Sequence, residues 1–277
     1  MLAKIVEPLI EWYEENHRIL PWRASKNPYY IWISEIMLQQ TRVEAVRPFF
    51  ERFIKVLPKV EDVAVCPEEQ LLKLWEGLGY YNRVRNIQKA AVRIVEEYGG
   101  RLPADYEKLK ELPGIGNYTA GAVASIAYDL PVPAVDGNVL RVYARIMEDD
   151  SDILKQSVKT KVENEFLKVM PGSRSGTFNQ ALMELGAMVC VPNGAPKCDA
   201  CPVAEYCQAR VHGTALDLPV KKKRQERRKE EKTVLVLRDG DRVAIRKRPG
   251  KGLLAGMYEL PNLEGYLSEE EILSWVK

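Results

Sequence analysis

The stretch Leu112 to Ala120, with the sequence LPGIGNYTA, constrains the fold of this chain more than any other segment. Its Pro-Gly-x-Gly part is typical of the end of one helix, and the residues from Asn117 onward predict the start of the next. Glycines let backbone N–H groups approach an anion closely, and a helix N-terminus supplies partial positive charge. The stretch therefore predicts two helices joined by a turn, with Gly114 and Gly116 at a phosphate-binding position.

A carboxylate follows this unit in the segment VDGNV at residues 135–139. A plain helical hairpin and a surface aspartate would explain each feature separately. Together, L-P-G-I-G-x-Y-T-A and V-D-G-N-V-x-R-V resemble the helix-hairpin-helix DNA glycosylases, specifically the MutY-type adenine glycosylases. The resemblance implies a catalytic site in which Asp136 stabilises or covalently traps a developing sugar cation, Asn138 orients neighbouring groups and Tyr118 tunes the pocket.

Glu35 lies in the apolar segment from Pro28 to Thr41. Periodicity alone favours a solvent-facing helix residue there. Burial would instead raise the pKa of this carboxyl group and keep it protonated near neutral pH, as a general acid requires. The match of S-E-I-M-L-Q-Q-T to the family implies that Glu35 protonates the adenine, and that Gln40 and Thr41 face the DNA near the opposite base.

Tyr118 occupies the position that separates the members of this superfamily. Bifunctional relatives of the endonuclease III type place a lysine there, and its amine forms a Schiff base that leads to strand cleavage. Tyrosine cannot form one. The resemblance therefore implies a monofunctional enzyme that leaves an abasic site.

Further DNA or substrate contacts are expected in three places. The Gly-rich stretch before Arg83 suits a tight loop that meets a phosphate backbone, with Leu78 or Tyr80 inserted into the base stack; the alternative is that its tyrosines pack in the core. In the family pattern the P-W-R segment at residues 21–23 borders the base pocket, although Trp22 also suits a core aromatic. Gln180 carries the donor and acceptor that reading a base edge requires, whereas Glu184 is expected to pair structurally. The full set is Trp22, Arg23, Leu38, Gln40, Thr41, Leu78, Gly79, Tyr80, Arg83, Gly114, Gly116 and Gln180.

Four of the five cysteines are crowded together as C-x7-C-x2-C-x5-C, at Cys190, Cys198, Cys201 and Cys207. Such crowding favours metal ligation over disulfides in a cytosolic chain, and Cys66 is expected to be a buried, inert thiol. Zinc sites usually show two C-x2-C pairs, so uneven all-cysteine spacing suits a [4Fe–4S] cluster better. The family carries this cluster on C-x6-C-x2-C-x5-C, and we expect Gly194 to absorb the additional residue in the first gap.

The expected fold is mostly α-helical: a two-lobed helix-hairpin-helix glycosylase with a [4Fe–4S] loop and a partial α/β Nudix-like C-terminal domain. Residues 1–22 and 131–220 would form the cluster lobe, and residues 23–130 the helical-barrel lobe with the hairpin. A charged, apolar-free linker would span residues 221–232. The chain has no run of 18 apolar residues and no signal-peptide pattern, which favours a cytoplasmic, bacterial-type protein associated with the nucleoid through DNA.

The sequence pattern changes from helical to strand-like at residues 233–277. Apolar strands are expected on either side of an Asp239-Gly240 turn. The following G-L-L-x-G-M-x-E-x-P segment resembles the start of the Nudix-like domain that recognises 8-oxoguanine in the family. No glutamate-rich pyrophosphatase motif accompanies it, so we expect no nucleotide hydrolysis. The chain ends part-way through this pattern, so either the sequence is truncated or damage reading is reduced.

The expected function is excision of adenine mispaired with 8-oxoguanine or G in double-stranded DNA, by a monomer without membrane contact. The net charge of +2 requires any basic DNA surface to be local. Three alternatives stay open: a thymine or uracil mismatch glycosylase, a bifunctional endonuclease III-like enzyme, and a non-catalytic DNA-binding iron–sulfur protein.

Overall fold

The computed structural model describes residues 1–222 and 229–276, and the chain divides into two compact units, Met1–Lys222 and Lys223–Lys277. Part of the linker expected at residues 221–232, namely 223–228, lies outside the described residues.

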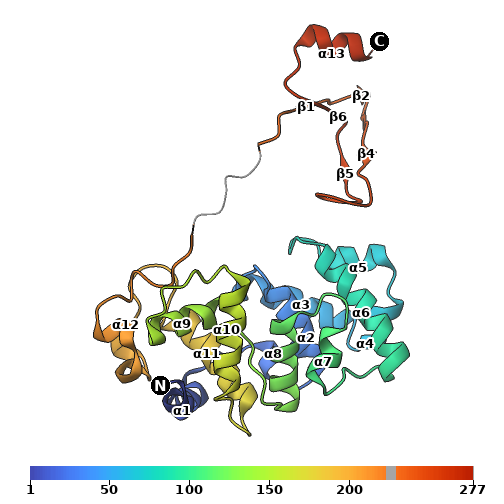
Figure 1. Ribbon diagram of the computed structural model, residues 1–277. Helices are drawn as coiled ribbons and strands as arrows, with labels where there is room; N and C mark the ends of the chain where they lie inside the picture. The colour runs from blue at the N-terminus through green and yellow to red at the C-terminus, as the bar shows by residue number, and fades with distance from the viewer. Residues whose placement is uncertain (223–228, 277) are drawn as a thin grey trace. The chain divides into compact units, whose positions relative to one another are not determined.

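The first unit consists of helices joined by short turns (Figure 1). The prediction of a mostly helical chain is confirmed. The α-helices of this unit are α1 (Val6–Asn16), α2 (Pro28–Leu38), α3 (Val43–Val56), α4 (Val60–Val65), α5 (Glu68–Leu74), α6 (Asn82–Tyr98), α7 (Tyr106–Lys110), α8 (Asn117–Tyr128), α9 (Gly137–Met147), α10 (Gln156–Leu167), α11 (Ser175–Met188) and α12 (Gln208–Val211). Short 3-10 helices are η1 (Leu2–Ile5), η2 (Pro21–Arg23), η3 (Cys198–Ala200) and η4 (Ala204–Tyr206).

Two clusters of buried apolar side chains form the core of this unit. One comes from residues 20–124 and joins helices α2 to α8. The other joins residues 2–13 to residues 135–203, so α1 packs against α11 although the two are far apart in sequence (Figure 1). The division of this unit into the two expected lobes stays a prediction.

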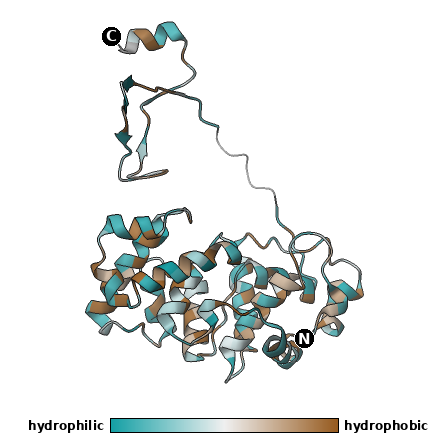
Figure 2. Cartoon of the chain, turned by 180° about the vertical axis from the view of Figure 1, so that it is seen from behind, coloured by the Kyte–Doolittle hydropathy of each residue, from teal (hydrophilic) through white to brown (hydrophobic). Residues whose placement is uncertain are grey.

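Helix α2 differs from its neighbours in being buried nearly all round. Hydrophobic and hydrophilic residues alternate along most helices of the unit (Figure 2), as expected where one face meets the core. In α2, by contrast, Tyr29 and every residue from Ile31 to Met37 are buried, including Glu35. The helix begins at Pro28 because Asn27 caps it, accepting a hydrogen bond from the Tyr29 N–H at 2.9 Å.

The predicted helical hairpin is confirmed. Helix α7 ends at Lys110 and α8 begins at Asn117. Gly114 has φ +79°, a conformation that favours glycine, and a Cβ atom there would lie 2.7 Å from Cβ of Asn86. Glycine at position 114 is therefore required by its backbone conformation and by its close approach to α6.

The second unit contains short antiparallel pairs of strands: β1 (Lys232–Val234) with β6 (Asn262–Glu264), β2 (Arg238–Asp239) with β3 (Arg242–Val243), and β4 (Arg246–Lys247) with β5 (Tyr258–Glu259). The last helix is α13 (Glu269–Val276). The β2–β3 pair and its turn at Gly240 (φ +57°) confirm the predicted hairpin, although β1 pairs with β6 instead of extending it. The Nudix-like character of this unit stays a prediction.

None of the helices in the described part of the chain has the length and apolar content needed to span a bilayer.

Candidate active site

A cleft of about 700 Å³ opens in the first unit among η2, α2, α11 and the N-terminal ends of α8 and α9. Many of the residues singled out in the sequence meet there. Those that line the cleft are Trp22, Arg23, Glu35, Leu38, Gln40, Thr41, Tyr118, Asp136, Asn138 and Gln180.

Glu35 is a buried carboxyl group in this cleft, only 7% exposed. Burial raises the pKa of Glu35 to about 7, and the nearby Asp136 adds to this rise, whereas Tyr118 and Arg23 oppose it. The Tyr118 hydroxyl donates a hydrogen bond to Oε2 of Glu35 at 2.5 Å. Burial and the neighbouring carboxylates also raise the pKa of Tyr118 well above 10, so the phenol stays a donor. Near neutral pH, Glu35 can therefore hold and release a proton.

Asp136 caps the N-terminus of α9, where its geometry favours the ionised form. Its Oδ1 accepts hydrogen bonds from the backbone N–H groups of Asn138 and Val139, both at 2.8 Å, and its Oδ2 accepts one from the Asn138 side chain at 2.7 Å. Burial raises the pKa of Asp136, but these three donors favour the carboxylate. The cleft thus holds two carboxyl groups in different environments, one able to donate a proton and one suited to carry charge.

Asn138 is fixed by contacts on both sides. Arg141 donates to its Oδ1 at 2.9 Å, and the same guanidinium donates to the backbone carbonyls of Gly186 at 2.7 Å and Cys190 at 2.8 Å. A Cβ atom at Gly186 would lie 2.6 Å from Cβ of Asn138, so only glycine lets α11 approach α9 this closely. Asp136 is thereby linked, through Asn138 and Arg141, to the segment that begins at Cys190.

Glu184 holds two arginines at the edge of the cleft. Its carboxylate accepts from Nε of Arg18 at 2.7 Å and from Arg23 at 2.8 Å. Burial by itself would raise the pKa of Glu184, but the hydrogen bonds from Arg18 and Arg23 lower it to about 2. Glu184 therefore pairs structurally, as expected. Arg18 lines the cleft but was missed in the sequence, because a single arginine in a polar connection belongs to no pattern.

The loop at residues 77–83 corrects two expectations. Tyr80 is 66% exposed and available to DNA, whereas Leu78 is only 6% exposed and packs in the core, so Leu78 is not placed to intercalate. The guanidinium of Arg83 is bound to backbone carbonyls of its own chain and does not present itself to phosphates. Gly79 lies in this loop with φ +68°, and Gly114 and Gly116 lie in the hairpin, outside the cleft.

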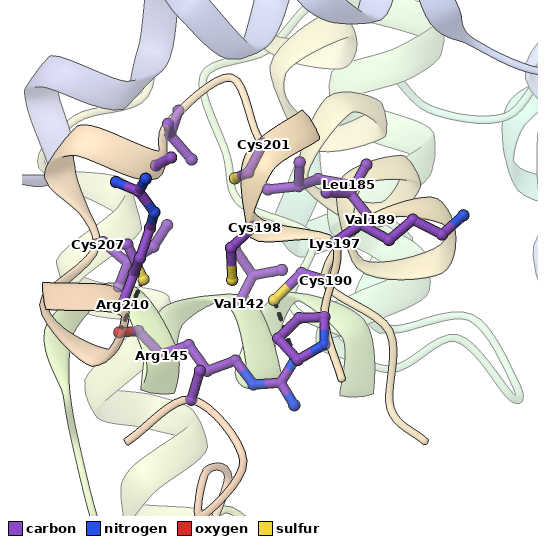
Figure 3. A pocket seen from close by; sticks show the side chains of 15 residues that line it. Val142, Arg145, Leu185, Val189, Cys190, Lys197, Cys198, Cys201, Cys207 and Arg210 are labelled. Carbon is purple, nitrogen blue, oxygen red and sulfur yellow. Dashed lines mark hydrogen bonds between the residues drawn. The ribbon is translucent and has the colours of Figure 1, made fainter. Parts of the chain in front are cut away.

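The four cysteines of the motif line one small, mostly apolar cavity formed by α9, the end of α11 and the segment from Cys190 to Cys207 (Figure 3). Arg145 donates to Sγ of Cys190 at 3.2 Å. Burial raises the pKa of Cys201 to about 11 and raises that of Cys207. Ionisation of these thiols is therefore unfavourable unless a cation lies among them. Gly194 adopts φ +74° in the longer first gap.

The four cysteines do not form a compact single-metal site in the described part of the chain. Within residues 1–222 and 229–276, no three His, Cys, Asp or Glu side chains are grouped to hold one metal ion. A zinc ion needs all of its sulfur ligands at about 2.3 Å. The four cysteines around one shared cavity supply the all-sulfur donor set that an iron–sulfur cluster takes. Cys66 is buried and lies outside this cavity, as expected.

Residues 33–171 match the family described as HhH-GPD superfamily base excision DNA repair protein. The chain belongs to this superfamily. The matched segment contains Glu35, the hairpin, Tyr118 and Asp136.

Within the HhH-GPD superfamily, the expected resemblance to the adenine DNA glycosylases is confirmed. The chain is 36% identical to the adenine DNA glycosylase of Mus musculus, over 95% of this chain and 61% of the mouse protein. It is 33% identical to that of Buchnera aphidicola subsp. Baizongia pistaciae, over 98% of this chain and 76% of that protein. The chain thus spans about three fifths of the length of its mammalian relative.

Solved HhH-GPD structures share the helical fold. A thermostable thymine-DNA glycosylase matches 76% of this chain with a TM-score of 0.66 at 27% identity, over 97% of its own length. A trapped covalent intermediate of endonuclease III with DNA matches 76% of this chain with a TM-score of 0.64 at 26% identity, over 96% of its own length. Proteins with this fold thus bear names that refer to different bases. The fold alone does not identify the substrate, so a substrate has to be inferred from the residues in the cleft.

Proposed function

We propose that this protein is a monofunctional DNA glycosylase that excises adenine mispaired with 8-oxoguanine or G from duplex DNA. The observation that carries the proposal is the pairing of Glu35, with its pKa raised to about 7, and the capped carboxylate of Asp136 in one cleft. The names of its relatives and the presence of tyrosine at position 118 support adenine as the base and hydrolysis as the outcome.

The chemistry breaks the bond between C1′ of the sugar and N9 of adenine. The target nucleotide must first leave the base stack and enter the cleft. Glu35 donates its proton to a ring nitrogen of the base, and the electron pair of the broken bond goes to the leaving adenine. Asp136 stabilises the positive charge that develops on the sugar, or traps it covalently. Water then adds at C1′ and gives its proton to the Glu35 carboxylate, which restores the acid.

Tyr118 and Asn138 act on these two carboxyl groups rather than on the reacting bond. Tyr118 orients Glu35 through its hydroxyl, and Asn138 orients Asp136. Gln180, Trp22, Arg23 and Leu38 would contact the flipped base, whereas Gln40, Thr41 and Tyr80 would enter the duplex. The hairpin with Gly114 and Gly116 would bind a backbone phosphate.

Base release under single-turnover conditions tests the proposal. Three duplexes would be compared, with A opposite 8-oxoguanine, A opposite G and T opposite G. Adenine release that becomes strand scission only after alkali supports the monofunctional adenine glycosylase. Thymine release would assign the protein to the mismatch class, and inactivity on all three duplexes would favour a non-catalytic DNA-binding protein.

Replacing Tyr118 by lysine is expected to introduce strand cleavage without alkali. The amine would lie in the cleft beside Asp136 and can form a Schiff base with the exposed sugar aldehyde, which tyrosine cannot. Borohydride trapping of a covalent protein–DNA complex measures this. A Tyr118→Phe variant is the control, because it removes the hydrogen bond to Glu35 without adding an amine. Equal trapping of both variants would contradict the assigned role of position 118.

We infer that Cys190, Cys198, Cys201 and Cys207 bind a [4Fe–4S] cluster, as the endonuclease III-like fold implies. When bound, the cluster supplies a structural centre for the segment from Cys190 to Cys207. Cys198→Ser is expected to lower iron and sulfide content and the temperature of unfolding. Cys66→Ser is the matched control, because Cys66 is a buried thiol outside the cavity. Full iron content in Cys198→Ser would contradict this ligand assignment.

A further inference from the structure

Arg83 connects two segments that the proposed function places against DNA. It is the second residue of α6, and its guanidinium donates five hydrogen bonds to backbone carbonyls. Nη1 donates to the end of α2 and the residues that follow it: Ile36 at 2.9 Å, Met37 at 3.1 Å and Gln39 at 2.6 Å. Nη2 donates to the loop before α6: Leu78 at 3.0 Å and Gly79 at 3.3 Å.

Both segments carry a residue in a strained backbone conformation directly after a carbonyl that Arg83 holds. Gln40 follows Gln39 and has φ +60°, and Tyr80 follows Gly79 and has φ +49°. Side chains other than glycine rarely adopt this region, and such residues persist when their surroundings fix them. The guanidinium of Arg83 therefore helps to hold the strained backbone at both Gln40 and Tyr80.

The aromatic contacts of Arg83 reinforce this connection. Its guanidinium carbon lies 5.5 Å from the centre of the Tyr80 ring and 5.4 Å from that of the buried Trp75. Cation–π contact of this kind orients an exposed ring without covering it. Tyr80 is 66% exposed, and Arg83 contacts both its ring and the carbonyl of the preceding Gly79. The same arginine binds the carbonyl of Gln39, directly before Gln40.

We propose that Arg83 is a positioning residue that fixes the spacing between the segments Gln39–Thr41 and Leu78–Tyr80, so that Gln40 and Tyr80 enter the duplex together. This rests on the proposed function for the nature of the ligand. Lysine cannot replace arginine here, because one ammonium group lacks the planar fork that reaches two sets of carbonyls. The role differs from the phosphate contact that the sequence indicates for this arginine.

Unstacking of a duplex tests this directly, because it does not depend on excision. A duplex with 2-aminopurine beside the target adenine would be titrated with wild type, Arg83→Lys and Arg83→Gln. Both variants are expected to lose most of the fluorescence rise that unstacking produces. Single-turnover excision should fall about 100-fold, the loss that follows from a misplacement of about 1 Å. The pH at which excision is half-maximal should not move, because Glu35 is untouched.

Arg85→Gln is the matched control. Arg85 lies on the same helix, but it pairs with the exposed carboxylate of Glu68 at 2.8 Å. A double-mutant cycle with Tyr80→Ala adds a readout that general destabilisation would not give. If Arg83 acts by placing Tyr80, the loss in Arg83→Gln should shrink markedly once Tyr80 is removed.

Several results would overturn the inference. Normal unstacking in folded Arg83→Lys, additive losses in the cycle, or a shifted pH midpoint would each do so. Should Arg83→Gln fail to fold, Arg83→Lys, which keeps the charge and part of the bonding, decides the matter. If the wild-type protein unstacks DNA but excises no base, the proposed function is contradicted and the role of Arg83 is not.

Discussion

Glu35→Gln is expected to lower single-turnover adenine release by roughly 10³-fold, within the range that general acid catalysis contributes. Glutamine keeps the size of the side chain and can still accept a hydrogen bond from Tyr118, which lies 2.5 Å away in the wild type. It has no acidic proton to give to the base. Glu96→Gln, at an exposed position on α6, is the control and should excise adenine normally.

The pH dependence of adenine excision by the wild type should reflect the ionisation of Glu35. Because burial raises the pKa of Glu35 to about 7, the protonated form predominates below that pH. Excision should be independent of Glu35 ionisation below pH 7 and should fall about tenfold per pH unit above it. Residual activity of Glu35→Gln should lack this fall. A profile that instead rises through pH 7 would show that the carboxylate, not the acid, is the active form.

The stability of the wild type should fall with rising pH, as its excision activity does, whereas Glu35→Gln should be less active and, at high pH, more stable than the wild type. The folded-state pKa of Glu35, about 7, lies above its ordinary value of 4.5, so the folded protein binds more protons between these pH values. The free energy of unfolding should therefore fall as the pH rises through this range, by roughly 3 kcal/mol at most. Glu35→Gln removes that fall and should be more stable than wild type above pH 7. Denaturant unfolding at pH 5 and pH 8 measures the difference.

Sequence patterns predicted those features of the molecule that depend on residues close together in the chain. The hairpin turn and the cysteine segment are each specified within a few residues. Glu35 is different, because the amphipathic pattern on which periodicity relies is missing from α2, a helix buried nearly all round. Its burial depends on packing against α3 and α8, so only the resemblance to a family indicated it.

Contacts between distant residues account for what the sequence did not reveal. Glu184 reaches Arg18 across 166 positions, and Arg83 reaches Gln39 across 44. An arginine after a glycine-rich loop suits a phosphate and a set of backbone carbonyls equally well, because both are acceptors. Choosing between them requires knowing which carbonyls lack partners, which only the fold determines.

Asp136→Asn is expected to lower single-turnover adenine release by about 10²–10³-fold while leaving the fold in place. Asparagine caps helices about as well as aspartate, and its carbonyl oxygen can accept the N–H groups of Asn138 and Val139 as Oδ1 does now at 2.8 Å. It lacks the negative charge facing the sugar cation, and it lacks the Oδ2 acceptor for the Asn138 amide, which donates at 2.7 Å in the wild type. Circular dichroism should therefore resemble wild type and the temperature of unfolding should fall only modestly, whereas excision should fall strongly.

Asp105→Asn provides a matched control for this variant, since Asp105 caps α7 by accepting from the Lys108 N–H at 3.0 Å and does not line the cleft. If capping were the whole role of Asp136, both variants would behave alike. The combined Glu35→Gln, Asp136→Asn variant distinguishes the mechanism further. Because the two groups act in one transition state, its loss should be smaller than the product of the single losses. A fully multiplicative loss would mean that the two carboxyl groups contribute independently of each other.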